Sequence, residues 1–100
     1  MRLNVKRSDQ AQIDPSDIWP TIAEDNMRAA DGVYERINDT ILMVAEHPEA
    51  GRARDDLQPG LRYFPVGSYL IFYTIEPGIL GIRRIMHGAR DIKAALFDDD

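Results

Sequence analysis

The chain has 100 residues, of which 44% are hydrophobic, and this length predicts a single domain over residues 1–100. It contains no cysteine, which excludes disulfides, thiolate metal sites and thiol nucleophiles. No apolar run reaches the ~18 residues of a membrane span, and no signal-peptide core follows the basic opening residues. We therefore expect a soluble cytoplasmic protein without a membrane partner.

The charge is unevenly distributed along the chain, although the net charge of -5 is acidic. Residues 1–49 carry five Lys or Arg against ten Asp or Glu, residues 50–93 carry seven against four, and residues 98–100 are all Asp. The acidic total argues against a general nucleic-acid binder. The basic second half suits either an anionic partner or an ordinary solvated surface, and the sequence leaves both explanations open.

The first quarter of the chain predicts a strand followed by a helix. Residues 2–7 alternate, with Leu3 and Val5 on one side, as in a half-buried strand. Ser8 or Asp14 is placed to cap the helix that follows. The apolar stripe of that helix consists of Ile18, Trp19, Ile22 and Ala23.

A second, longer helix is expected to begin after Asp25 or Asn26 and to end near Glu46, before His47 and Pro48. Apolar residues spaced three and four apart give it one buried face. These residues are Met27, Ala30, Tyr34, Ile37, Ile41 and Val44. Because the connection between the two helices is short, we expect them to form an antiparallel hairpin.

After Pro48 the hydrophobic pattern changes to that of strands separated by turns. Three strands are expected, Leu61–Val66, Tyr69–Ile75 and Ile79–Met86, and a short helix over Ile92–Phe97 follows them. The nearly unbroken apolar run at Tyr69–Ile75 is typical of a central strand covered on both sides. The predicted fold is α+β: an N-terminal strand, then an antiparallel helical hairpin packed on a small, mainly antiparallel four-stranded sheet, and a C-terminal helix.

Arginines gather in the second half of the chain, among strands and turns. Guanidinium groups held in such positions grip anionic surfaces and can stabilise the charge that develops in phosphoryl transfer. The candidate target-binding residues are Arg52, Arg54, Arg62, Arg83, Arg84, His87 and Arg90.

Each of these candidates has a structural alternative. Arg52 and Arg54 are equally suited to a solvated turn or to pairing with Asp55 and Asp56. Arg90 is equally placed to pair with Asp91 or to cap the final helix. His87 follows a strand end, where a histidine is often satisfied by a neighbouring carbonyl. Arg62 and Arg83 are expected on adjacent strands with their side chains on one face, if the register allows it.

Five segments, taken in order and spacing, resemble the ParE branch of the RelE/ParE toxin superfamily over nearly the whole chain. They are Ile18-Trp19 with Ile22-Ala23-Glu24-Asp25-Asn26, Pro48-x-x-Gly51-Arg52-x-Arg54, Gly60-Leu61-Arg62, Tyr69-Leu70-Ile71-Phe72-Tyr73, and Ile85-Met86-His87-Gly88-Ala89-Arg90-Asp91-Ile92.

The resemblance implies a toxin of a bacterial type II toxin-antitoxin system that inhibits growth and stabilises plasmids. Its expected partners are a ParD-like antitoxin and, as the target, DNA gyrase; the complex is expected to bind operator DNA through the antitoxin. The antitoxin tail would fold on binding, with a helix across the hairpin and a strand along a sheet edge. No cofactor and no metal are implied.

RelE-like relatives of the same fold cut messenger RNA on the ribosome, so an enzyme must also be considered. Such cleavage needs an acid, a base and stabilisation of phosphorane charge, for which Arg62, Arg83 and His87 are the candidates. The lysine-rich stretch of those nucleases is missing, because only Lys6 and Lys93 are present. We therefore favour a gyrase-trapping protein without catalytic residues; the alternatives are a metal-independent endoribonuclease or an inactive toxin retained for antitoxin binding and operon autoregulation.

Overall fold

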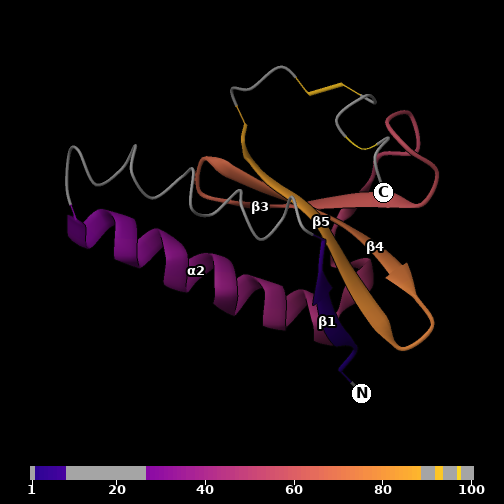
Figure 1. Cartoon of the computed structure of the whole chain (residues 1–100), viewed down its shortest axis with the longest axis horizontal. Helices are drawn as coiled ribbons and strands as arrows, with labels where there is room; N and C mark the ends of the chain where they lie inside the picture. The colour runs from indigo at the N-terminus through magenta and orange to yellow at the C-terminus, as the bar shows by residue number, and fades with distance from the viewer. Residues whose placement is uncertain (1, 9–26, 89–91, 94–96, 98–100) are drawn as a thin grey trace.

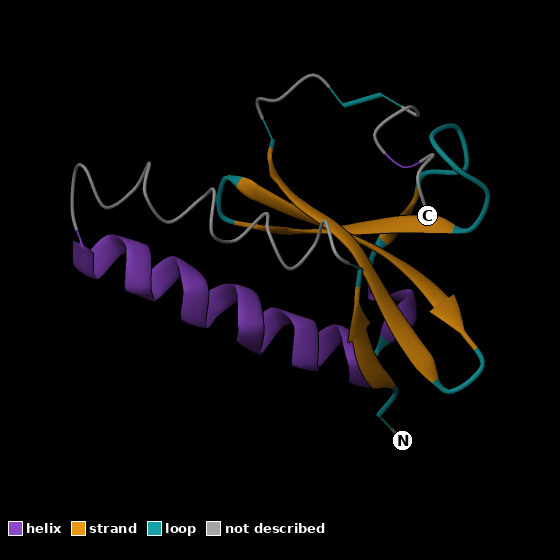
Figure 2. Cartoon of the chain, viewed as in Figure 1, coloured by secondary structure: helices purple, strands orange, loops and turns teal. Residues whose placement is uncertain are grey.

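The computed structural model describes residues 2–8, 27–88, 92, 93 and 97. A long helix lies along one face of a twisted sheet, which confirms the α+β class (Figures 1 and 2). The elements are β1 (Asn4–Arg7), α2 (Met27–Glu46), the 3₁₀ turn η1 (Pro48–Ala50), β2 (Arg52–Ala53), β3 (Leu61–Val66), β4 (Tyr69–Glu76) and β5 (Ile79–His87). The expected first helix and most of the expected terminal helix lie outside the described residues. No helix in the described part is long and apolar enough to cross a membrane.

The sheet has five strands in the order β1-β5-β4-β3-β2, so the expected number of four was wrong. The additional strand is β2, whose two residues pair antiparallel with β3. A two-residue strand is too short to show the alternation by which strands are recognised in a sequence. The pairing of β1 with β5 is parallel, and the remaining pairs are antiparallel.

The three long strands lie where the sequence predicted them. β3 has the expected bounds, and β4 and β5 each extend one residue further. Gly67 and Gly78 have φ angles of 58° and 73° in the two hairpin turns, a region that glycine enters without steric cost. The sheet order makes β4 the central strand, as predicted, with Ile71 and Tyr73 on one face and Phe72 on the other fully buried.

Helix α2 covers one face of the sheet, which we call the helix-facing side. Its buried residues Ile37, Ile41 and Val44 are spaced as the sequence predicted, and they pack with Tyr73 and Ile82 of the sheet. Leu3 of the N-terminal segment packs against the same cluster, and its backbone N–H donates to the Ala45 carbonyl at 2.9 Å. The helix ends before Pro48, because proline disfavours helical backbone in the residue that precedes it.

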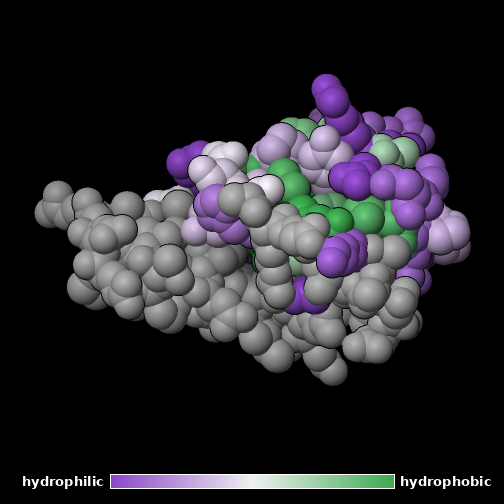
Figure 3. Space-filling view, turned by 90° about the horizontal axis from the view of Figure 1, so that it is seen from above, coloured by the Kyte–Doolittle hydropathy of each residue, from purple (hydrophilic) through white to green (hydrophobic). Residues whose placement is uncertain are grey.

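The opposite side of the sheet, which we call the outer face, carries a second, smaller core. Leu61, Phe72, Met86 and Phe97 are buried there. The Phe97 ring packs on Phe72 with 5.0 Å between the centroids. Figure 3, the view from above in Figure 1, shows apolar surface bordered by hydrophilic side chains. The sheet therefore lies between two apolar layers, and its polar side chains are divided between two faces.

Candidate functional site

The strand pairing separates the arginines that the sequence groups together. Arg62 of β3 lies opposite Tyr73 of β4, whereas Arg84 of β5 lies opposite Phe72. Since Tyr73 belongs to the helix-facing core and Phe72 to the outer one, Arg62 and Arg84 are on different faces. Strands β3 and β5 are not adjacent either, because β4 separates them. Arg83, which reaches the Phe97 carbonyl in the outer core, is likewise on the other face from Arg62, so the expectation that Arg62 and Arg83 share a face on adjacent strands was wrong.

On the helix-facing side, Arg62 belongs to a continuous hydrogen-bond network with Gly51, Tyr73 and Pro48. Its Nη1 donates to the Gly51 carbonyl at 2.9 Å, and the Gly51 N–H donates to the Tyr73 hydroxyl at 3.0 Å. That hydroxyl donates in turn to the Pro48 carbonyl at 2.7 Å. Burial raises the pKa of Tyr73, although the Gly51 N–H and the Arg62 charge oppose this rise. The network fixes the segment between α2 and β2.

Gly51 is required in this network because a side chain has no room there. A Cβ atom at residue 51 would lie 2.6 Å from the Tyr63 carbonyl oxygen and closer still to the Tyr73 hydroxyl. The Gly51-Arg52 pair, noted in the sequence as part of a resemblance, thus has a physical reason: glycine allows the loop to approach Tyr73, and β2 begins at the next residue.

On the outer face, two arginines stand at the ends of one cross-strand row. Arg52 lies opposite Tyr63, Tyr63 opposite Phe72, and Phe72 opposite Arg84. The Tyr63 and Phe72 ring centroids are 5.9 Å apart. Three strand spacings place the two arginine backbones about 14 Å apart. We call these four residues the outer row. Phe72 is fully buried beneath Phe97, so a partner would meet Arg52, Tyr63 and Arg84; two cations beside an aromatic ring suit an anionic partner surface.

Arg83 also belongs to the outer face. The register shifts between Phe72 and Tyr73 of β4, so that Ile82 and Arg84 of β5 have partners across the strands and Arg83 between them does not. Such a bulge re-aims a side chain. The Arg83 Nη2 donates to the Phe97 carbonyl at 3.0 Å, and the Gln58 Nε2 donates to the same oxygen at 3.1 Å. Arg83 thereby helps to hold the residue that covers Phe72.

Arg54 is paired within its own loop. Its Nε and Nη2 donate to the two carboxylate oxygens of Asp56, both at 2.9 Å. These hydrogen bonds lower the pKa of Asp56 and raise that of Arg54. Asp55 instead accepts the backbone N–H of Gly60 at 2.9 Å. Pairing with Asp56, one of the two explanations left open by the sequence, is therefore confirmed.

The three nuclease candidates do not converge on one point. His87 is exposed at the end of β5, where its ring forms a T-shaped contact with the Tyr69 ring at a centroid distance of 5.1 Å. Arg62 lies opposite Tyr73, whereas His87 lies opposite Tyr69. These two positions on β4 are four residues apart, so their backbones are separated by about 13 Å along the strand. Arg83 is on the other face. Arg90, the remaining candidate, lies outside the described residues, and no group of His, Asp or Glu among the described ones can hold a metal ion.

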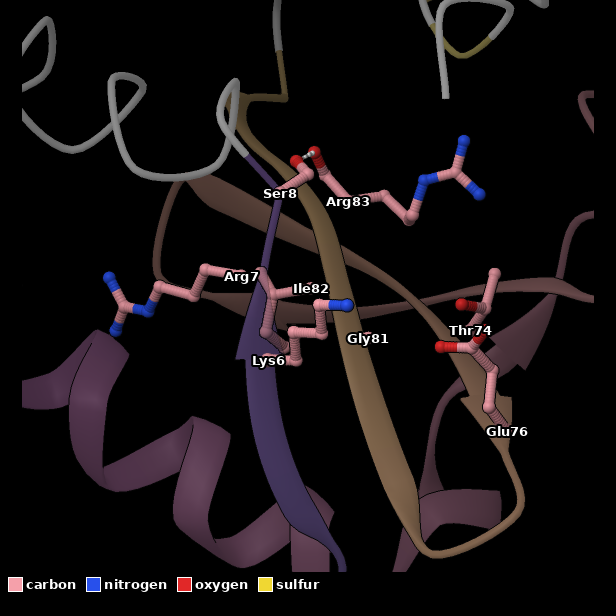
Figure 4. A pocket seen from close by; sticks show the side chains of 8 residues that line it. All are labelled: Lys6, Arg7, Ser8, Thr74, Glu76, Gly81, Ile82 and Arg83. Atoms are coloured by element: carbon pink, nitrogen blue, oxygen red, sulfur yellow. Dashed lines mark hydrogen bonds between the residues drawn. The ribbon is translucent and has the colours of Figure 1, made fainter.

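A groove with a volume of about 290 Å³ opens beside Arg83, and the sequence did not predict it. Strands β1, β4 and β5 supply its lining residues, which are Lys6, Arg7, Ser8, Thr74, Glu76, Gly81, Ile82 and Arg83. In Figure 4 the Lys6 amine extends across Gly81, while Arg7 points away toward α2. There the Arg7 Nη2 donates to the Asn38 side chain at 2.7 Å.

The groove could not be predicted because its residues are far apart in the sequence. The Ser8 hydroxyl donates to the Arg83 carbonyl at 2.7 Å across 75 positions. Only the parallel pairing of β1 with β5 brings Lys6 next to Gly81, and no local pattern indicates that pairing. The alternation of residues 2–7 predicted a strand, but not its neighbour in the sheet.

Comparisons with known proteins agree on one family. Residues 5–92 match the model of the ParE toxin of the type II toxin-antitoxin system parDE. The chain is 35% identical over 92 residues to Toxin ParE1 of Caulobacter vibrioides, covering 89% of this chain and 93% of that protein. It is 29% identical over 87 residues to Toxin ParE1 of Mycobacterium tuberculosis, covering 85% and 89%.

Solved structures that share the fold include two from toxin-antitoxin systems. A chain of the chromosomal ParDE toxin-antitoxin system from P. aeruginosa aligns with a TM-score of 0.73 and 16% identity, covering 86% of this chain and 96% of that one. A chain of the RelBE2 toxin-antitoxin complex from Mycobacterium tuberculosis aligns with a TM-score of 0.61 and 20% identity, covering 87% and 99%. The family match over most of the sequence, on the fold just described, shows that this chain belongs to the ParE toxins of type II toxin-antitoxin systems.

Proposed function

We propose that this toxin acts by binding DNA gyrase and trapping it on cleaved DNA, without a catalytic residue of its own. The observation that carries the proposal is the outer row, where Arg52 and Arg84 stand on one face on either side of the partly exposed Tyr63 and the buried Phe72. A contact surface needs such groups spread over an area, whereas a nuclease needs them around one phosphate. The dispersal of Arg62, Arg83 and His87 supports binding rather than cleavage.

The remaining parts of the proposal concern the toxin's regulation and location. We infer that a ParD-like antitoxin neutralises the toxin and that their complex binds operator DNA through the antitoxin, all in the cytoplasm. In support, the chains from P. aeruginosa and Mycobacterium tuberculosis that share the fold come from a toxin-antitoxin system and a toxin-antitoxin complex. Among the sequence-derived candidates, we retain Arg52, Arg84, His87 and Arg90 for target contact and assign Arg54, Arg62 and Arg83 to the structure of the chain itself.

The proposal is tested with the purified chain, free of antitoxin, incubated with gyrase, supercoiled plasmid and ATP. We expect linear plasmid that depends on both proteins, because trapped double-strand breaks are released as linear DNA. A folded sample that gives no linear DNA would overturn gyrase trapping. Cleavage of ribosome-bound messenger RNA by that sample would then favour the nuclease, and normal growth on induction would favour an inactive toxin.

Charge reversal tests the position of the target surface. The double change Arg52→Glu and Arg84→Glu replaces both cations of the outer row and should reduce linear DNA at least about tenfold, since like charges oppose binding. The matched control is Arg36→Glu, because Arg36 is an exposed arginine on α2 in the other layer of the fold. Circular dichroism establishes that all variants are folded. Equal activity of the double variant and the control would exclude the outer row as the contact.

A further inference from the structure

The groove beside Arg83 exists because one side chain is missing from a cross-strand row. Gly81 of β5 lies opposite Lys6 of β1 on one side and opposite Thr74 of β4 on the other. Thr74 in turn lies opposite Leu61 of the outer core, so this row belongs to the outer face. Glycine leaves the middle position empty, and two strand spacings separate the backbones of Lys6 and Thr74 by about 10 Å. The groove therefore has a backbone floor between two polar walls.

Polar side chains from both walls point over this floor. Figure 4 shows the Lys6 amine on the β1 side, and the Thr74 hydroxyl and the Glu76 carboxylate on the β4 side. A Cβ atom at residue 81 would lie 3.0 Å from the Thr74 hydroxyl oxygen and 3.2 Å from a Glu76 carboxylate oxygen, so the glycine keeps this space open. Within the described part of the chain, no ion pair joins Lys6 to Glu76. A cation and a carboxylate thus face each other across an open space.

The two walls require a ligand that accepts hydrogen bonds on one side and donates them on the other. The Lys6 amine only donates, the ionised Glu76 carboxylate only accepts and offers two oxygens, and the Thr74 hydroxyl does either. The groove volume of about 290 Å³ lies at the lower end of ligand pockets, which begin at roughly 300 Å³. A small planar group with one acceptor beside two donors fits these conditions.

Among the bases of nucleic acids, guanine has this pattern. Its Watson–Crick edge carries the O6 acceptor next to the N1–H and N2–H₂ donors, so a carboxylate can accept two hydrogen bonds while an amine donates to O6. Adenine, cytosine and thymine have one donor group on this edge and can give a carboxylate only one such bond. A base read at this edge must be unpaired. Arg83, which also lines the groove, adds the positive charge that suits the phosphate of a nucleotide.

We propose that the groove binds an unpaired guanine base, with Glu76 accepting from N1 and N2 and Lys6 donating to O6. The base belongs either to a free nucleotide or to single-stranded DNA, since both present the same edge. The acidic net charge does not oppose such a site, because base contacts supply specificity, whereas phosphate contacts supply the salt-dependent affinity. The site does not depend on gyrase trapping, and it lies beside β1, at the edge of the sheet opposite to β2 and Arg52.

Calorimetry on the purified chain, free of antitoxin and without gyrase, tests the site with two nucleotides that differ by one amino group. Guanosine monophosphate should bind at least about tenfold more tightly than inosine monophosphate, which lacks the N2 amine and therefore loses one hydrogen bond to Glu76. Adenosine monophosphate should bind more weakly than either, because it presents a donor in place of O6. Equal affinities for the guanosine and inosine nucleotides, or no binding of either, would overturn the guanine site.

Substitutions in the two walls should act differently on this preference. Glu76→Gln should weaken guanosine monophosphate about tenfold and remove most of the preference over inosine monophosphate, because an amide offers one acceptor oxygen in place of two. Lys6→Met should weaken both nucleotides by a similar factor, since both keep O6. Glu49→Gln, at an exposed glutamate of η1, is the control and should leave both affinities unchanged. If Glu76→Gln and Lys6→Met, shown to be folded by circular dichroism, had the same effect on the preference, the assigned contacts would be wrong.

Oligonucleotides distinguish the two sources of the base. A short single-stranded DNA with one guanine should lose at least about tenfold in affinity when it is paired in a duplex, because pairing occupies the Watson–Crick edge. A single strand that binds more tightly than the mononucleotide assigns the site to DNA, and a mononucleotide that binds at least as tightly assigns it to a free nucleotide. A duplex that binds as tightly as the single strand would overturn recognition of an unpaired base.

Discussion

The two faces of the sheet use arginine in different ways. On the helix-facing side, Arg62 is fixed by its hydrogen bond to the Gly51 carbonyl, in a network that also holds Tyr73 and Pro48. On the outer face, Arg52 is exposed and stands with Arg84 at the ends of a row of aromatic rings. Closeness in the sequence therefore does not make these arginines one site; strand register decides on which face of the sheet each of them lies.

The largest expected effect comes from filling the space at Gly51. Gly51→Ala should lower the free energy of unfolding by about 3 kcal/mol, because its Cβ would overlap the Tyr73 hydroxyl and the Tyr63 carbonyl. Ala53→Val, which adds two methyl groups at an exposed position of β2, should change it by less than about 0.5 kcal/mol. Urea denaturation measures both. Similar values for the two variants would show that the loop can move away from Tyr73.

Removal of the Tyr73 hydroxyl should have the next largest effect. Tyr73→Phe leaves the buried Gly51 N–H and the Pro48 carbonyl without this partner, at a cost of about 2 kcal/mol in the free energy of unfolding. Tyr34→Phe on α2, whose side chain is half-buried, is the control and should remain close to the wild type. A Tyr73→Phe protein as stable as the control would show that the hydrogen bonds of Tyr73 to Gly51 and Pro48 do not stabilise the fold.

The same hydroxyl should make the protein sensitive to alkali. Because burial raises the pKa of Tyr73, the folded chain holds this proton more tightly than the unfolded chain does. Stability is thus fully present below the unfolded pKa of about 10 and falls as the pH rises above it. Tyr73→Phe should flatten this alkaline decline in urea titrations, leaving the part that comes from Tyr69, whose pKa burial also raises. An unchanged slope would exclude Tyr73 as its source.

A smaller difference in stability is expected between substitutions at Arg62 and at Arg52, two arginines near β2. Arg62→Gln should lower the free energy of unfolding by about 1 kcal/mol through loss of the bond to Gly51, whereas Arg52→Gln should change it by less than about 0.5 kcal/mol. In the gyrase assay, Arg52→Gln should reduce the amount of linear DNA more than Arg62→Gln does, when the two variants are compared at equal folded fraction. Equal destabilisation by the two changes would remove the proposed division between the faces.

The smallest expected effect is at the Arg54–Asp56 pair. Asp56→Asn should leave the melting temperature near pH 7 unchanged within error, because this ion pair is exposed to solvent. The pKa of Asp56 is lowered, so whatever stability the pair provides is present above the ordinary carboxyl pKa and is lost as the pH falls through the lowered value. Because the contribution of an exposed pair is small, the acid-unfolding curves of the variant and the wild type should nearly coincide, and a clear separation would assign the pair a larger role.

The order and bounds of the main elements were predictable from the sequence alone. Apolar spacing of three and four located α2, and the apolar runs bounded by Gly67 and Gly78 located β3, β4 and β5 to within one residue. These signals are local, because each depends on residues within a few positions of one another. The five segments that resemble the ParE toxins could likewise be recognised from the sequence alone, and the match to the family model confirmed this resemblance.

Only the tertiary structure decided which side chains share a face and which strands form the edges. The bulge that re-aims Arg83, the register that separates Arg62 from Arg84, and the parallel pairing that places Lys6 beside Gly81 all depend on contacts between distant strands. A shift of one residue in pairing would move every side chain of a strand to the other face. The sequence by itself thus determined the elements and the family, while strand register, set by packing on both sides of the sheet, determined the candidate surfaces.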